Sequence, residues 1–256
     1  MSFELPTGKV KAERVNPKTM VLFSKPKIGK TTALSQLENC LLIDVEDGSQ
    51  FVDAVKVNVL NEAKKQNISP IAAIKQLIDK LKKANEAKGD FVYQYGVVDT
   101  VSALEDHCLL LANKMYRDTP QGRNWQGDDV TTLPNGAGYQ HTRKALSMVL
   151  DEMAECFDTF IISGHVKDKL VEKEGKEMNE RGLNLIGKSA SILCSQVDAV
   201  GYVYREDNKT IVNFTPSETL IAGSRSEHLK NQKITLIESD DKGNLNVDWS
   251  KIFIKD

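Results

Sequence analysis

The sequence predicts an α/β protein with a mainly parallel sheet flanked by helices, followed by a β-rich C-terminal extension. Short apolar runs alternate with segments of helical periodicity through residue 165, as in β–α units that build a parallel sheet. The last third contains a predicted hairpin and two further strand-like runs from residue 233 onward. We therefore expect one compact domain, with an N-terminal extension over residues 1–17, a core over 18–230 and a β-rich tail over 231–256.

The composition is that of an ordinary globular protein. Its 34 basic and 36 acidic residues give a net charge of −2, whereas a dedicated DNA-binding protein usually carries an evident basic excess. No apolar run approaches the roughly 20 residues of a membrane span, and the N-terminus lacks the apolar segment of a secretory signal. We expect a cytoplasmic protein with no membrane partner. The four cysteines are far apart, so we expect reduced, buried thiols.

The predicted elements follow one another in a regular order. Residues 19–23 form an apolar run, 30–38 a helix and 41–43 a second apolar run. A long helix is expected from Pro70 to Lys88, because Ser69 suits the N-cap and Gly89 follows the last turn. The remaining elements are a strand over 91–98, a helix to about residue 115, an aperiodic polar loop over 116–138, a helix over 140–156, a strand over 160–162, a charged stretch over 166–182 and a hairpin turning at 207–208.

The strongest chemical signal is a loop between the first apolar run and the first helix. A loop in this place can turn its backbone N–H groups inward to cradle a phosphate. Gly29 allows close backbone approach, Lys30 supplies charge for the β- and γ-phosphates, and Thr31 supplies a hydroxyl for Mg²⁺. The alternative is a solvated basic turn. The first position of the phosphate-binding pattern is Ser24, where glycine is usual. The expected nucleotide-binding residues are Ser24, Lys25, Pro26, Lys27, Ile28, Gly29, Lys30, Thr31 and Thr32.

Three more polar residues follow predicted strands. Asp99 ends the run 95–98, and a carboxylate at the carboxyl end of a sheet strand can hold Mg²⁺; otherwise it caps the next helix. Glu46 lies just beyond the second apolar run and can polarise a water that attacks the γ-phosphate; otherwise it is a surface acid. His165 follows the strand at 160–162 and can contact the γ-phosphate, although a lone histidine is more often structural.

The order of these motifs resembles the RecA-like ATPase core, and most closely the phage-encoded RecA-like proteins of the single-strand-annealing recombinase group. The resemblance covers roughly residues 18–230. Its motifs are SKPKIGKTT (24–32), LLIDVEDG (41–48), VVDTVS (97–102), a helix led by Tyr139, IISGH (161–165), GKSA (187–190) with Val197 and Asp198, and GSR (223–225).

This resemblance implies ATP and Mg²⁺ as ligands. It also implies Glu46 as the water-activating carboxylate, Asp99 as the Walker B acid and His165 as a γ-phosphate sensor. The family's ATP sites commonly lie between subunits, so it implies a homo-oligomer in which Arg225 is a candidate finger acting on a neighbour's site. A phage-encoded protein of this kind works in the cytoplasm of a bacterial host.

Two segments are candidates for contact with single-stranded DNA. Residues 166–182, where the family would place a DNA-contacting loop, have five basic and five acidic side chains, which is typical of a solvated hairpin. The segment 116–144 mixes aromatic and basic residues, a combination that suits base stacking and phosphate contacts; the alternative is a mobile loop with no such role. Its candidate residues are Arg117, Arg123 and Trp125, with Tyr116, Arg143 and Lys144 nearby.

We therefore expect an ATPase that binds single-stranded DNA and assists recombination or annealing. The balanced charge keeps open a nucleotide-dependent adaptor or loader with little turnover. A P-loop small-molecule kinase is less favoured, because the seven arginines are scattered and form no lid-like cluster. The sequence lacks an Asn-Lys-x-Asp motif for reading guanine, which argues against a GTPase.

Overall fold

The computed structural model describes residues 5, 7–173, 176–240 and 242–255. In chain order the helices and strands are β1 (Thr19–Ser24), α1 (Lys30–Ser35), β2 (Cys40–Asp44), β3 (Lys56–Asn58), α2 (Val59–Gln66), α3 (Pro70–Lys88), β4 (Tyr95–Asp99), α4 (Val101–Arg117), α5 (Ala137–Ala154), β5 (Thr159–Lys173), β6 (Lys176–Leu183), α6 (Ser189–Gln196), β7 (Ala199–Glu206), β8 (Lys209–Asn213), β9 (Gly223–Ser224), β10 (Lys233–Ser239) and β11 (Leu245–Val247). Short 3₁₀ turns include η1 (Ser49–Phe51) and η2 (Val130–Thr132).

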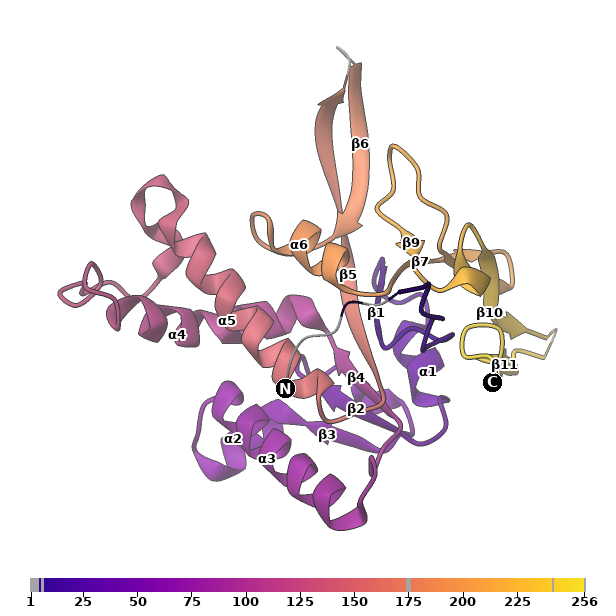
Figure 1. The fold of residues 1–256 in the computed structure, drawn as a ribbon, viewed down its shortest axis with the longest axis horizontal. Coiled ribbons are helices and arrows are strands. Elements are labelled where there is room, and N and C mark those ends of the chain that lie inside the picture. Colours follow the sequence, from indigo (N-terminus) through magenta and orange to yellow (C-terminus); the bar gives the residue numbers. More distant parts are fainter. Residues whose placement is uncertain (1–4, 6, 174–175, 241, 256) are drawn as a thin grey trace.

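A single sheet organises the described residues. Its strand order is β11-β10-β8-β7-β1-β5-β4-β2-β3, with β6 paired to β5 and β9 to β7 (Figure 1). From β3 to β7 all neighbouring strands are parallel, and beyond β7 the strands β8, β10 and β11 pair antiparallel. The predicted α/β class, with a mainly parallel sheet flanked by helices, is confirmed. The parallel strands end at one edge, where Asp44, Asp99 and Ser163 lie side by side in register and Ser24 lies opposite His165.

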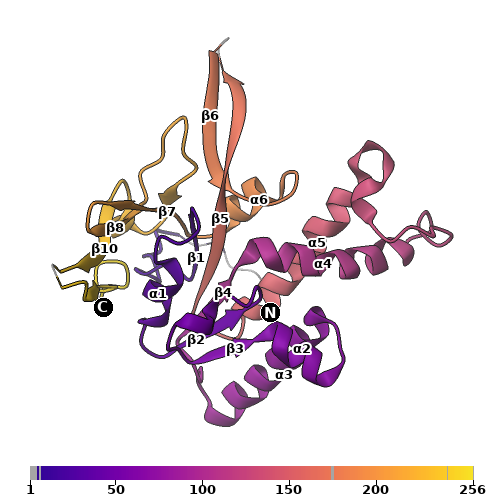
Figure 2. The same ribbon diagram turned by 180° about the vertical axis from the view of Figure 1, so that it is seen from behind.

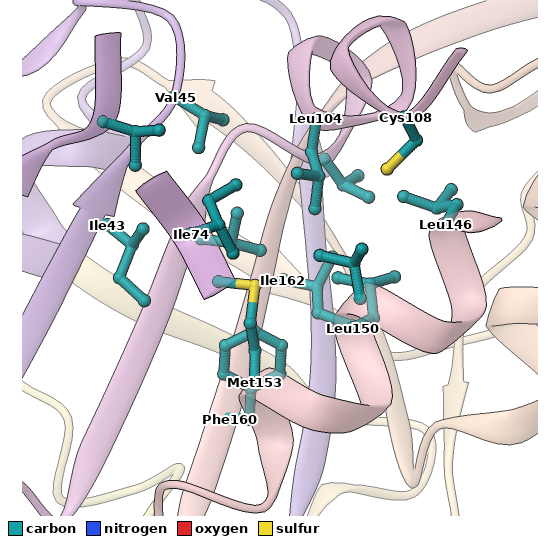
Figure 3. Close-up of a cluster of buried hydrophobic side chains, with 14 of the residues drawn as sticks. Ile43, Val45, Ile74, Leu104, Cys108, Leu146, Leu150, Met153, Phe160 and Ile162 are labelled. Atoms are coloured by element: carbon teal, nitrogen blue, oxygen red, sulfur yellow. The ribbon is translucent and has the colours of Figure 1, made fainter. Parts of the chain in front are cut away.

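Two apolar cores hold the sheet between its helices. On one face, α2 to α5 pack against the parallel strands, and Ile74, Leu104, Leu150 and Phe160 belong to one buried cluster (Figure 3). On the other face, α1 and the C-terminal tail pack together. Trp249 in the tail is almost fully buried and donates its indole N–H to the Ala33 carbonyl at 2.9 Å. The tail therefore supports the short helix that follows the glycine- and lysine-bearing loop.

Several element predictions are confirmed by the structure. Helix α3 has the expected bounds: the Ser69 hydroxyl accepts a hydrogen bond from the Ala72 N–H, and Gly89 adopts a positive φ of 72°. The hairpin β7–β8 turns at 207–208 as predicted. Other boundaries differ: α1 ends at Ser35 rather than residue 38, and β4 begins at Tyr95 rather than residue 91. The sequence analysis missed β3, α2 and α6.

The charged stretch 166–182 forms a hairpin, because β5 continues far beyond the sheet and pairs with β6. In both views the hairpin projects from the body of the molecule (Figures 1 and 2). Arg181 on β6 donates to the Asp168 carboxylate on β5 at 2.9 Å. The hairpin is therefore an arm whose base, at His165, lies at the carboxyl edge of the sheet.

The cysteines are free thiols, and Cys40, Cys108 and Cys156 are buried. Burial raises the pKa of Cys40 and Cys108 to about 12, so both thiols stay protonated at neutral pH. The helices described here include none with the length and apolar character needed to cross a membrane.

Candidate functional site

The loop between β1 and α1 turns at two residues with positive φ, Lys27 (65°) and Gly29 (94°). Ser24, which stands where glycine is usual, is instead the last residue of β1 and is fully buried, with its hydroxyl donating to the Lys25 carbonyl at 2.8 Å. Left-handed backbone is therefore not required at Ser24, and a serine fits there. Lys25, Pro26 and Lys27 are exposed, whereas Ile28 is partly buried and packs against the apolar core. Thr32 is the third residue of α1 and is half-buried.

Lys30 is the first residue of α1 and reaches from the loop to the neighbouring strand. Its ammonium is buried and donates to the Gly164 carbonyl at 3.2 Å. Burial lowers the pKa of Lys30, and the carboxylates of Asp99 and Glu46 oppose this effect by favouring the charged form. A cation is thus placed between the loop and the carboxyl edge of the sheet.

Asp99 lies near Lys30, and its carboxylate accepts hydrogen bonds from two hydroxyl groups. The Thr31 hydroxyl donates to one carboxylate oxygen at 2.7 Å, and the Ser163 hydroxyl donates to the other at 2.5 Å. The alternative role of capping the next helix belongs to Thr100, whose hydroxyl accepts the Ala103 N–H at 3.4 Å. A carboxylate next to a threonine hydroxyl is a set of hard oxygen atoms, which Mg²⁺ prefers.

Glu46 is held at the same edge by its loop and by its neighbours. The buried Asp44 carboxylate accepts hydrogen bonds from the backbone N–H groups of Glu46 and Gly48. The Glu46 side chain accepts from the Thr100 hydroxyl at 2.8 Å and lies 3.3 Å from His165 Nε2. Its side chain is 30% exposed. Glu46 is therefore a positioned carboxylate that water can reach, rather than a free surface acid.

His165 completes this group of side chains. It ends the part of β5 that lies in the sheet and begins the hairpin arm. Its Nδ1 is buried and has no hydrogen-bond partner among the residues described. Lys30, Thr31, Asp99, Glu46 and His165 thus meet at one edge. Thr100 and Ser163, which the sequence analysis did not single out, are the hydroxyl groups that tie the two acids in place.

Arg225 lies elsewhere. It follows β9, which pairs with the start of β7 and so lies at the amino edge of the parallel strands. Its guanidinium donates to the carbonyls of Ser195 at 2.7 Å and Gln196 at 3.3 Å, at the end of α6. The side chain is 62% exposed. Arg225 is therefore at the amino edge of the parallel strands, opposite the carboxyl edge where the loop after β1 lies.

The candidate DNA-contacting residues lie at the far end of α4. This helix starts at the carboxyl edge and its 17 residues span about 25 Å. The Arg117 guanidinium lies 5.3 Å from the centre of the Trp125 ring, and the ring packs edge-on against Tyr116. Arg123 is exposed. The structure brings Arg117 and Trp125 together but places them away from the acidic and basic groups around Asp99.

The fold and the site together define a protein of the P-loop NTPase class. A phosphate-binding type of loop opens the first helix, and the carboxylate at the end of β4 contacts the threonine that follows the loop lysine. The sequence profile of a family described as an AAA domain matches residues 16–226, and the chain belongs to this family.

Two solved structures match the chain over most of its length. One is the crystal structure of the RadB recombinase, with 12% identity, a TM-score of 0.42 and coverage of 91% of this chain and 92% of that one. The other is a KaiC-like protein from the hyperthermophilic archaeon Pyrococcus horikoshii, with 11% identity, a TM-score of 0.42 and coverage of 90% and 89%. No curated protein sequence matches the chain.

Proposed function

We propose that this chain binds ATP with Mg²⁺ and hydrolyses it. The observation that carries the proposal is the 2.7 Å contact between the Thr31 hydroxyl and the Asp99 carboxylate, with Lys30 and Glu46 at the same edge. The backbone around Gly29 and the Lys30 ammonium would hold the phosphates. Thr31 and Asp99 would hold Mg²⁺, which neutralises charge on the phosphate oxygens when it is bound.

Glu46 is the general base in this proposal. Its carboxylate is partly exposed and is oriented by the Thr100 hydroxyl, so it can accept the proton of an attacking water. Thr100, which orients the proposed base, directly follows Asp99, the proposed metal ligand, at the end of β4. His165 contacts Glu46 and begins the hairpin arm. Loss of the γ-phosphate would therefore change the contacts of His165 and the position of the base of the arm.

We further propose that the protein forms homo-oligomers, binds single-stranded DNA and assists recombination or annealing. The support for DNA contact is the pairing of Trp125 with Arg117, next to the exposed Arg123, at the end of α4. Binding would exchange the cation–π contact within the chain for a base stacked on the indole, with the arginine turned to a phosphate.

A fluorescence titration tests the DNA part. Single-stranded DNA should quench Trp125, and affinity should fall with salt at a log–log slope of about −0.7 for each phosphate contact. Trp125→Ala should weaken binding by about 1–3 kcal/mol if one stacked base is lost. Leu110→Ala, which alters an exposed residue of α4, should leave affinity unchanged.

The same protein preparation separates the competing functions. ATP turnover that rises with single-stranded DNA supports the proposal. ATP binding with negligible turnover and no salt-dependent DNA binding would replace it with a nucleotide-dependent adaptor or loader. Transfer of the γ-phosphate to a small acceptor, with water excluded as the acceptor, would replace it with a kinase.

A further inference from the structure

Phe51 is the most exposed large apolar side chain among the described residues. It lies in the turn η1, on the loop between β2 and β3, and is 97% exposed; Val55 on the same loop is 57% exposed. A phenylalanine buries a large apolar area when it enters a pocket, so an exposed one on a fixed loop is a strong docking element.

Hydrogen bonds order the backbone of the loop that carries Phe51. The Asp44 carboxylate accepts from the Ser49 N–H at 2.9 Å and from the Ser49 hydroxyl at 2.6 Å. On the other side, Lys56 Nζ donates to the Ser49 and Val52 carbonyls. Because the loop backbone is already ordered, docking would cost mainly the freedom of the Phe51 side-chain torsions.

A groove of matching character lies between α5 and α6. Its volume is about 280 Å³, and its apolar wall is formed by Leu146, Leu150, Ile192 and Leu193. A cavity of about 150 Å³ with similar lining is enough to hold benzene, so an aromatic ring fits. Arg143 and Lys144 stand on the rim of this groove.

The charges around Phe51 and around the groove are complementary. The Phe51 loop carries Asp47 and the exposed Asp53, and Glu46 precedes them. One cation, Lys56, lies at the end of the loop, so its net charge is negative. The rim of the groove is basic because it carries Arg143 and Lys144. One acid, Asp151, also lines the groove. An acidic loop with an aromatic tip therefore suits a basic-rimmed apolar groove.

The groove that receives Phe51 cannot be that of the same chain. Helix α6 leads into β7, which lies four strands from β2 in the sheet, or about 19 Å across. We propose that Phe51 of one copy docks in the α5–α6 groove of the next copy. Because the two surfaces differ, the contact is head-to-tail and generates a ring or a helical filament. This inference rests on the proposed homo-oligomer, and it needs neither ATP hydrolysis nor DNA.

Docking would also place the neighbouring copy beside the site described above. Glu46 opens the same loop that carries Phe51, and Asp44 anchors both halves of that loop. Assembly through this contact would therefore affect the position of Glu46, the proposed base.

Two complementary variants test the interface by sedimentation, in the presence of a non-hydrolysable ATP analogue. Phe51→Ser removes the docking side chain and keeps the groove, whereas the double variant Arg143→Glu, Lys144→Glu reverses the rim and keeps Phe51. Each alone should associate at least about 30-fold more weakly than wild type, as expected for a central interface residue. Mixed together, they should form one-to-one dimers and nothing larger, because only one intact interface can form.

Leu110→Ser, which alters another exposed apolar side chain on α4, is the matched control and should assemble as wild type does. Unchanged nucleotide affinity in each variant shows that it is folded. Wild-type assembly that survives Phe51→Ser, or a mixture that stays monomeric, overturns the interface alone. A wild-type protein that stays monomeric at all concentrations overturns both the interface and the proposed homo-oligomer.

Discussion

At the scale of single residues, the site depends on carboxylates that are fixed by hydroxyl groups. Asp99 is only 4% exposed, and each of its oxygens accepts one hydrogen bond, from Thr31 or from Ser163. A buried carboxylate without such partners would be costly, so these contacts stabilise it where it is needed. Glu46 differs because its side chain remains partly open to water. The two acids therefore suit different tasks, metal binding and proton acceptance.

Glu46→Gln should keep ATP and Mg²⁺ binding but lower turnover by at least the ~10²-fold typical of a lost general base. The amide keeps the shape of the side chain and its contact with Thr100, yet cannot accept the proton. Steady-state hydrolysis and nucleotide affinity measure the two effects separately. Asp79→Asn, which alters an exposed acid on α3, is the control. Turnover within a few-fold of wild type would show that Glu46 is not the base.

The residues of the loop could be predicted because they are contiguous in the sequence. Gly29, Lys30 and Thr31 carry a chemical pattern that is independent of the rest of the chain. The contact between Glu46 and His165 joins residues 119 positions apart, and the contact between Ser163 and Asp99 joins residues 64 apart. Such contacts follow from strand order and register, which periodicity in the sequence does not specify.

At the scale of elements, short loops at strand ends position the chemistry. The loop after β2 is organised by Asp44, which is 1% exposed and accepts three backbone N–H groups and the Ser49 hydroxyl. Long elements with clear caps, such as α3, were predictable from the sequence. The edge strand β3 has three residues and α2 and α6 have eight each, so their patterns were too short to detect.

Asp44→Ala should destabilise the protein by about 3 kcal/mol, because buried backbone donors lose their charged acceptor. It should also slow ATP turnover, because the loop that places Glu46 loses its anchor. Urea unfolding measures the first effect and steady-state hydrolysis the second. Asp53→Ala should change the free energy of unfolding by less than about 0.5 kcal/mol, since Asp53 is exposed. Equal stability of the two variants would contradict this role for Asp44.

At the scale of the whole molecule, the candidate residues lie at two opposite edges of the sheet. The P-loop, the acids and His165 lie at the carboxyl edge, and Arg225 lies at the amino edge against the end of α6. Arg225 is thus remote from the P-loop of its own chain, as the proposed role in a neighbouring subunit requires. The antiparallel strands β8, β10 and β11 extend the sheet beyond the parallel part.

Arg225→Ala should lose about 10³–10⁵-fold in hydrolysis rate while each subunit still binds ATP, if the arginine acts on a neighbour's site. Mixing Arg225→Ala with Glu46→Gln should restore partial activity. With random exchange of equal amounts, about a quarter of the interfaces then carry both intact groups. No recovery in assemblies shown to exchange subunits would contradict the role in a neighbouring site.

The most direct test of nucleotide binding by this loop is the ATP affinity and hydrolysis rate of Lys30→Ala. Lys30 is buried at the loop and is the cation that would meet the phosphates. Its loss should weaken ATP binding by about 10–100-fold, the range expected for charge-assisted hydrogen bonds, and abolish hydrolysis. Lys65→Ala, which removes an exposed lysine from α2, should change neither quantity. Folded Lys30→Ala protein with wild-type affinity and turnover would contradict the account.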